Sequence, residues 1–365
     1  MRKVFHQGLL LPFILFSIFI VTACVSDEHS RISNNVPDLI EDNTEGISDS
    51  PEKKIKIGFS MDTLEEERWH RDRDLFQRAL EALGAEVEVM NANVDDAIQI
   101  YQAETLISKG VDVLVVVPNN AEATAAIVNK AHMSGIKVLS YDRLVKNAEI
   151  DLYVSFDNEM IGELQAEAIT NLVPKGKYVY IGGAATDNNA HLLKKGAFNV
   201  LQPYIERGDI TIVYDQWTAD WDPANAFVNM EEALKANHNQ IDAVIAANDS
   251  TAGGVIEALA AQGLDGKVPV AGQDADLAAG QRIVEGTQTM TVYKPIMTLA
   301  TEAAELAVML AKGENIEAIR RINNGKIEVP SILLNPISVD KQNIDQTIIA
   351  DGFHSKEDIY KNVEE

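Results

Sequence analysis

The sequence has little cysteine and few basic residues. Cys24 is the only cysteine among 365 residues, and 31 Lys and Arg stand against 56 Asp and Glu. A single cysteine excludes an internal disulfide. The formal net charge of −25 argues against a nucleic-acid surface, because neutralising phosphates requires clustered cations. The length and an apolar content of 46% indicate a globular protein of about two domains.

The usual motifs of catalysis and cofactor binding are also missing. The glycine pairs at residues 182–183 and 253–254 lack the spacing of a dinucleotide or P-loop phosphate turn, and no G-x-S-x-G or H-E-x-x-H motif is present. The 7 histidines are scattered along the chain. We therefore expect no metal, no cofactor and no enzymatic activity.

The N-terminus carries a short apolar run, residues 8–21, preceded by Arg2 and Lys3. The run is too short for a convincing transmembrane helix, so it predicts a signal peptide over residues 1–23. It ends in "VTAC", which resembles the lipobox of bacterial lipoproteins and implies that Cys24 is lipidated. A buried free thiol is the alternative interpretation of Cys24.

Residues 24–53 are rich in Ser, Asp, Asn and Glu and show no sustained periodicity. Such a composition cannot bury enough apolar surface to offset the entropy of ordering. It predicts a flexible stalk. The folded body is then expected outside the cell, held to the membrane only by its lipid.

From residue 54 onward, short β-rich runs alternate with amphipathic helical patterns. The expected strands are residues 55–60, 86–90, 111–117, 137–141, 152–155, 178–182, 211–214, 243–246, 268–271 and 289–293. Runs such as "VDVLVVV" are apolar on both faces, as strands covered by helices on two sides must be. About ten strands are too many for one open sheet. The pattern predicts an α/β fold with two lobes built on parallel sheets.

Polar residues follow many of these strands. In open α/β sheets, ligands gather at the carboxyl ends of the strands. Those ends carry Asp, Asn, Arg and Lys, and the three tryptophans, Trp69, Trp217 and Trp221, lie in the same segments. Taken singly, each charged or amide residue is better explained as a helix cap or a surface ion pair. Together they suit a sugar, whose hydroxyls donate and accept hydrogen bonds and whose C–H faces stack on aromatic rings.

Several longer stretches carry a resemblance to a known family. They are "ERWHRDRDLF", "SYDRL", "VSFDNEMIGELQA", "DNNA", "ANDSTAGG", "GQDADLA" and "GTQTMTVYKP". With these motifs the chain resembles periplasmic sugar-binding proteins of the ribose/galactose type, from about residue 54 to residue 353. The resemblance implies the type I architecture, in which two Rossmann-like lobes with parallel sheets are joined by a three-segment hinge.

The resemblance also implies the ligand and the residues that bind it. Its motifs are most similar to the xylose-binding branch of the family, so it implies one monosaccharide, with D-xylose favoured. Carried over position by position, the implied ligand-binding residues are Arg68, Trp69, Asp142, Arg143, Asn189, Trp221, Asn248, Asp274 and Lys294. Asp187, Asn188 and Asp249 are possible neighbours, and Trp217 is expected to be a packing residue.

The expected boundaries of the lobes follow from the same resemblance. Residues 54–156 with 295–325 would form the N-terminal lobe and residues 157–294 the C-terminal lobe. Residues 326–365 would complete the hinge and the tail, where Pro330 and Pro336 disfavour a central strand. The family further implies a monomer that delivers its sugar to an ABC permease and its ATPase.

Three alternatives stay open. The same module could present bound sugar to a histidine kinase or chemoreceptor. A carbohydrate hydrolase could use Asp142 and Asp274 as an acid and base pair, although basic neighbours would lower the pKa that the acid needs. A sugar-responsive repressor is disfavoured by the signal peptide and by the missing basic helix-turn-helix.

Overall fold

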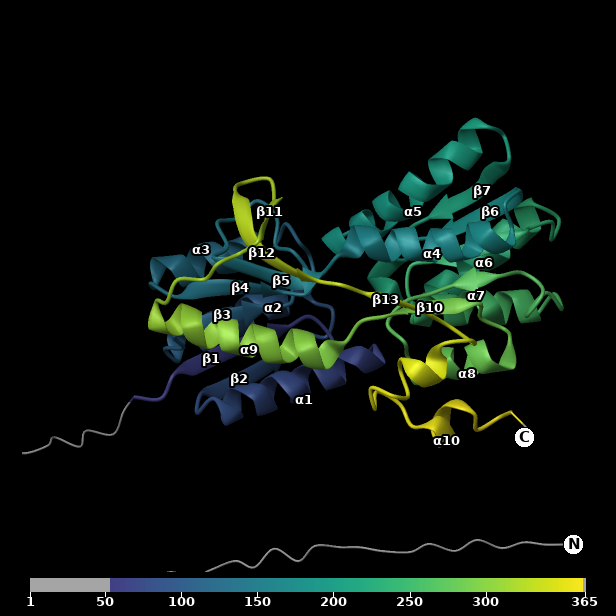
Figure 1. Cartoon of the computed structure of the whole chain (residues 1–365). Helices are drawn as coiled ribbons and strands as arrows, with labels where there is room; N and C mark the ends of the chain where they lie inside the picture. Colours follow the sequence, from purple (N-terminus) through teal and green to yellow (C-terminus); the bar gives the residue numbers. More distant parts are fainter. Residues whose placement is uncertain (1–52, 364–365) are drawn as a thin grey trace, which may run out of the picture. The chain divides into compact units, whose positions relative to one another are not determined.

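The computed structural model describes residues 53–363. The predicted signal peptide, Cys24 and all of the predicted stalk except its last residue lie outside the described residues. In the described part, strands and helices alternate and form two separate sheets with helices on their faces (Figure 1). The predicted α/β fold with two lobes is confirmed.

The first sheet is built mainly from the N-terminal half of the described chain. Its strands are, in spatial order, β11 (Arg320–Asn323), β12 (Glu328–Leu334), β5 (Leu152–Phe156), β4 (Lys137–Tyr141), β3 (Val113–Val116), β1 (Lys56–Met61) and β2 (Glu86–Asn91). All neighbours are parallel except the β11–β12 pair. Helices α1 (Glu67–Ala82) and α9 (Ile296–Lys312) pack together on one face, and α2 (Asp96–Ser108) and α3 (Ala125–Met133) cover the other.

Strand β3 illustrates why a central strand of this sheet is apolar at every position. Val113 and Val115 belong to the core beneath α1 and α9, whereas Leu114 and Val116 belong to the core beneath α2 and α3. Because successive side chains of a strand point to opposite faces, a strand covered on both sides must be apolar at every position. The sequence "VLVV" meets that requirement.

The second sheet contains, in spatial order, β13 (Ile337–Asp340), β10 (Met290–Tyr293), β9 (Val270–Ala271), β8 (Ala243–Ala246), β6 (Gly176–Ile181) and β7 (Ile210–Gln216). Only the β10–β13 pair is antiparallel among these strands. Its helices are α4 (Asn158–Leu172), α5 (Asn188–Glu206), α6 (Pro223–Ala236), α7 (Asp249–Ala260) and α8 (Leu277–Glu285). Helix α4 packs on α5, and α6 packs on α7. Short turns η1 (Ala219–Trp221) and η2 (Ile344–Gln346) and helix α10 (Lys356–Ile359) complete the fold.

Among the described residues the chain passes from one sheet to the other at three places, after β5, after β10 and after β12 (Figure 1). The segment after β10 enters α9, which packs against β3, β4 and β5 of the first sheet. Pro295 precedes α9 as its N-cap residue, and Tyr293 remains in the second sheet. The exact lobe boundaries stay a prediction.

The expectation for Pro330 was wrong. Pro330 lies within β12, which has β11 on one side and β5 on the other. It is tolerated because the parallel ladder with β5 begins one residue later, at Ser331, and Pro330 is opposite Arg321 of β11 only. Strands β11, β12 and β13 were not predicted. Strands β11 and β13 are short and mixed in sequence, as in "RRIN" of β11, and the apolar end of β12, "ILL", closely follows Pro330.

Candidate functional site

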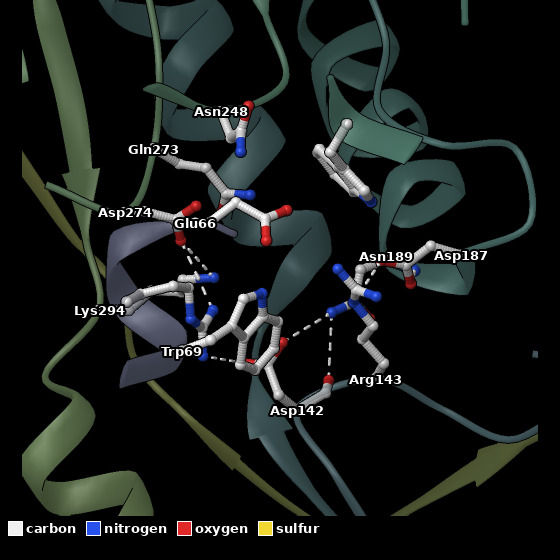
Figure 2. Close-up of a pocket in the computed structure, with 12 residues that line it drawn as sticks. Glu66, Trp69, Asp142, Arg143, Asp187, Asn189, Asn248, Gln273, Asp274 and Lys294 are labelled. Atoms are coloured by element: carbon white, nitrogen blue, oxygen red, sulfur yellow. Dashed lines mark hydrogen bonds and ion pairs between the residues drawn. The ribbon is translucent and has the colours of Figure 1, made fainter. Parts of the chain in front are cut away.

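A cavity is lined by residues from both lobes. All nine residues predicted as ligand-binding line it: Arg68, Trp69, Asp142, Arg143, Asn189, Trp221, Asn248, Asp274 and Lys294. Each is only 2–6% exposed. Figure 2 shows the labelled members pointing toward a common space.

The fold explains why these positions meet. Asp142, Arg143, Asn248, Asp274 and Lys294 come shortly after the carboxyl ends of strands, where the sequence pattern placed them. The remaining residues of the predicted set lie in or beside the first turns of α1 and α5 or at the end of η1. Helix starts lie near strand ends in parallel sheets, so both groups gather at the same edges.

Arg68 is the centre of one ionic network. Its Nη2 lies 2.8 Å from Oδ2 of Asp142, its Nε 3.0 Å from Oδ2 of Asp72, and its Nη1 3.5 Å from Oδ1 of Asp274. Asp72 also accepts a hydrogen bond from the hydroxyl of Tyr141. Burial opposes the charge of Arg68, but these carboxylates outweigh it and raise the Arg68 pKa well above its ordinary value. The guanidinium is therefore fixed in place and permanently charged.

Arg143 is the centre of a second network. Its Nη1 donates to Asp62 and its Nε lies 2.8 Å from Oδ2 of Asp187. The guanidinium groups of Arg143 and Arg68 lie 5.1 and 4.3 Å from the ring centroid of Trp69, within the range of cation–π attraction. These two guanidinium groups and the core residues that pack against Trp69 hold its ring in place.

Lys294 pairs with Asp274. Its Nζ lies 2.7 Å from Oδ1 of Asp274, and only 3% of Lys294 is exposed. This burial excludes a lysine that is simply solvated at the end of its strand. The lysine ends its strand inside the cavity because a carboxylate there compensates its charge.

Asn189 connects the lobes directly. Its Nδ2 donates to the backbone oxygen of Asp142, at 3.1 Å, and to Oδ1 of Asp142, at 3.2 Å. The backbone N–H of Asn189 donates to Oδ1 of Asp187, which caps α5. Asn248 caps α7 in a reciprocal capping box with Thr251. The caps that the sequence pattern allowed as an alternative are thus real, and the same residues line the cavity.

The pKa values of three carboxyl groups of the site are shifted in different directions. Burial alone would raise the pKa of Asp142, but Arg68 and Lys294 lower it below its ordinary value. Burial raises the pKa of Glu66 and that of Asp187, with Arg143 opposing the rise in both. Asp142 is therefore a poor proton donor, as expected from its basic neighbours.

Three residues of the site have unusual backbone angles. Asp142, Trp221 and Asp274 have φ of 60°, 58° and 100°, in the region that residues other than glycine rarely adopt. Each such conformation costs on the order of 1–3 kcal/mol and persists only where the surroundings determine it. Strain of this kind is concentrated at functional sites, and here it re-aims side chains that follow strands or turns toward the cavity.

A glycine makes room for Trp221. A Cβ on Gly183 would lie 2.2 Å from the Trp221 ring, so only glycine allows the indole this close to the backbone. Trp217 lies in the same way over Gly182, but it contacts the ring of His191 and the ammonium of Lys194 and does not line the cavity. Trp217 is a packing residue, as predicted.

Four buried polar atoms of the cavity wall have neither a hydrogen-bond partner nor an ion-pair partner. They are one donor, Nε1 of Trp221, and three acceptors, Oε2 of Glu66, Oδ1 of Asn189 and Oε1 of Gln273. Leaving such groups unpaired costs roughly 1–3 kcal/mol each, so they indicate a polar ligand. A ligand rich in hydroxyl groups would satisfy donors and acceptors alike.

Sequence reasoning missed Glu66 and Gln273 and left Asp187 undecided. Glu66 is the N-cap residue of α1, a position where a side chain normally bonds its own helix, yet Glu66 makes no such bond. Gln273 directly precedes Asp274 and follows β9, so its position after the carboxyl end of a strand could have identified it. Neither Asn188 nor Asp249 lines the cavity.

Two further properties hold for residues 53–363. No group of three or more His, Cys, Asp or Glu side chains there could hold a metal ion. No helix of this region has the length and apolarity needed to cross a membrane.

Comparison with known proteins agrees with the geometry. A family model described as "Periplasmic binding protein domain" matches residues 57–315. The D-xylose-binding periplasmic protein of Haemophilus influenzae is 55% identical over 86% of this chain and 94% of its own, and that of Escherichia coli is 53% identical over 84% and 93%.

A solved structure is similar as well. The carbohydrate transporter solute binding protein of Chloroflexus aurantiacus, in complex with D-glucose, has a TM-score of 0.78 and 32% identity, and the match covers 84% of this chain and 98% of that one. All three proteins are named for binding or transport and not for a reaction, so the prediction that the chain is not an enzyme is confirmed. On its sequence, its fold and the position of its cavity between two lobes, this chain belongs to the periplasmic binding protein family.

Proposed function

We propose that the protein binds D-xylose in the cavity between its lobes and delivers it to an ABC-type membrane permease. The observation that carries the proposal is the cavity wall itself, where four buried polar atoms without partners lie beside two tryptophans and two ionic networks. The names of the two relatives above 50% identity support xylose in particular.

The nine predicted residues would share the work of binding. The carboxylates of Asp142 and Asp274 accept hydrogen bonds from hydroxyl groups, and the cations of Arg68, Arg143 and Lys294 donate to sugar oxygens. Asn189 and Asn248 can do both. Trp69 and Trp221 would stack on the C–H faces of the ring. The ionic pairs already hold the charged side chains in place, so little side-chain entropy is lost on binding.

Binding would favour a closed arrangement of the lobes. A ligand that contacts both walls at once stabilises the state in which the walls are close. The lobes in this proposal keep the predicted boundaries after residues 156 and 294, and the connections after β5, β10 and β12 act as the hinge. The closed lobes would form the surface that the permease recognises.

The location follows the family, whose members named above are periplasmic. The protein is accordingly extracytoplasmic. We propose in addition that lipidated Cys24 anchors it to the membrane, on the strength of "VTAC" at the end of the apolar run.

Isothermal titration calorimetry tests the sugar. D-xylose, D-glucose, D-ribose and L-arabinose are titrated into the protein without its first 23 residues. We expect heat with D-xylose and the tightest binding for that sugar. Tighter binding of another aldose would identify that sugar as the ligand instead. No heat with any of the four sugars would refute the proposal.

A further inference from the structure

Asp249 is a buried carboxylate that does not reach the cavity. It is the first residue of α7, only 1% of it is exposed, and it lies behind the loop of residues 273–276 that carries Gln273 and Asp274 into the cavity. Its Oδ1 accepts from Nε2 of Gln288, at 2.7 Å. Its Oδ2 accepts from the hydroxyl of Thr291, at 2.8 Å, and from the backbone N–H of Asp276, at 3.1 Å.

The loop in front of Asp249 has a conformation that its residues do not favour. Asp274 and Ala275 follow one another with φ of 100° and 59°, and neither is glycine. Such a pair persists only where the surroundings determine it. The contacts around this loop therefore determine the orientation of Asp274.

Asp249 and Thr291 hold both ends of the strained loop. The backbone N–H of Asp249 donates to the oxygen of Gln273, at 2.9 Å, and the Asp249 carboxylate accepts from the N–H of Asp276. Between them, the N–H of Ala275 donates to the Thr291 hydroxyl, which itself donates to Asp249. The amide of Asp274 donates to the oxygen of Val292 in β10.

Neighbouring residues fit closely around the Asp249 carboxylate. A Cβ on Gly272 would lie 2.1 Å from Oδ1 of Asp249 and 2.8 Å from Nε2 of Gln288, so only glycine fits there. Arg282 supports the other side, with Nε donating to Oε1 of Gln288 and Nη2 donating to the backbone oxygen of Asp249. Burial still raises the pKa of Asp249, although Arg282 opposes the rise.

We propose that Asp249 is a positioning residue of the binding site: through its hydrogen bonds to residues 273–276 and to Thr291 it holds Gln273 and Asp274 toward the sugar without touching the sugar itself. This inference rests on the proposed function. Under this proposal Asp249, Gln288 and Thr291 contribute to sugar affinity, although all three are buried outside the cavity.

The hydrogen-bond pattern suggests a test in which the carboxylate of Asp249 and the amide of Gln288 are exchanged. In Asp249→Asn, the introduced amide nitrogen must face a donor. Facing Thr291 and the Asp276 N–H, it removes both loop contacts; facing Gln288 Nε2, it removes the contact that holds the side chain of residue 249 in place behind the loop. In the double variant Asp249→Asn with Gln288→Glu, that nitrogen can donate to the introduced carboxylate while the amide oxygen keeps the Thr291 and Asp276 contacts. Glu257→Gln, an exposed change on the same helix, removes one negative charge without touching the loop.

Calorimetry with D-xylose and hydrogen exchange followed by mass spectrometry are measured on all four proteins. We expect at least a tenfold loss of affinity and faster amide exchange at residues 274–276 in Asp249→Asn, with both restored to within threefold in the double variant and unchanged in Glu257→Gln. Wild-type affinity in Asp249→Asn, or a loss of affinity that the double variant does not restore, would overturn the inference.

The two measurements separate this inference from the function on which it rests. A wild-type protein that binds none of the aldoses would refute the proposed function and with it the role in affinity. Exchange at residues 274–276 that is the same in Asp249→Asn and wild type would refute the positioning role alone, whether or not sugar binds.

Discussion

Arg143 and Asp187 lie on different lobes, and Nε of the arginine is 2.8 Å from Oδ2 of the aspartate. Arg143 follows β4 of the first sheet, and Asp187 precedes α5 on the second. Both side chains are buried, and both line the cavity. The lobes are therefore joined by an ion pair at the wall of the cavity, so in the proposed function ligand binding and lobe closure would depend on the same residues.

Removing a charged group from the wall should weaken sugar binding strongly. We expect Arg143→Ala and Asp274→Ala each to cost at least ~2 kcal/mol of binding free energy, because each leaves a buried partner without its counter-charge. Calorimetry measures the loss. Arg207→Ala and Asp265→Ala, which change exposed residues, serve as matched controls and should bind normally. Unchanged affinity in both site variants would remove these residues from the site.

The lobe contact itself can be weakened without removing the helix cap. Asp187→Asn keeps an oxygen to accept from the N–H of Asn189 but loses the charge that faces Arg143. We expect the sugar-free protein to open more often and sugar affinity to fall by ~1 kcal/mol or more. Small-angle X-ray scattering should give a larger radius of gyration without sugar than in wild type. Identical scattering would show that this ion pair does not hold the lobes together.

Two neighbouring glycines allow a comparison of the tryptophans. Gly183→Ala would place a Cβ 2.2 Å from the ring of Trp221, and Gly182→Ala would place one 2.7 Å from Trp217. Both changes displace an indole and should destabilise the fold, but only Trp221 lines the cavity. We expect Gly183→Ala to lose at least ~1 kcal/mol more binding free energy than Gly182→Ala. Equal losses would argue against a role for Trp221 in binding.

The buried carboxyl of Asp249 predicts a dependence of stability on pH. Burial raises its pKa from 3.8 to about 7, so between these values the folded protein binds a proton that the unfolded chain releases. Stability from this group is therefore present at low pH and decreases as pH rises toward 7, at no more than ~1.4 kcal/mol per pH unit. Urea unfolding at pH 5 and pH 8 should show a smaller decrease for Asp249→Asn than for wild type. Equal decreases would contradict the raised pKa.

The lipid anchor is tested on the full-length precursor in bacterial cells. We expect wild type to fractionate with membranes and to carry acyl chains by mass spectrometry, because two or more chains give stable membrane attachment. Cys24→Ser should lack the acyl chains and be released from the membrane. Membrane attachment of Cys24→Ser equal to that of wild type would refute the anchor.

The sequence by itself determined the main architecture and most of the candidate site. Apolar runs such as residues 113–116 can be buried on both faces only in a parallel sheet covered by helices, and topology then brings the strand ends together. Asp142, Asn248, Asp274 and Lys294 could be found for that reason. The motifs of the family resemblance selected them from other polar residues that follow strands.

Only the tertiary structure decided how these residues are used. Strand β11 has no apolar pattern of its own and forms because β12 offers it a ladder. The positive φ of Asp142, Trp221 and Asp274 is unfavourable for any chain segment in isolation and depends on contacts from distant residues. The partners of Arg143 and Asp249 likewise come from distant parts of the sequence, since ion pairs and buried hydrogen bonds are set by distance in space and not by spacing along the chain.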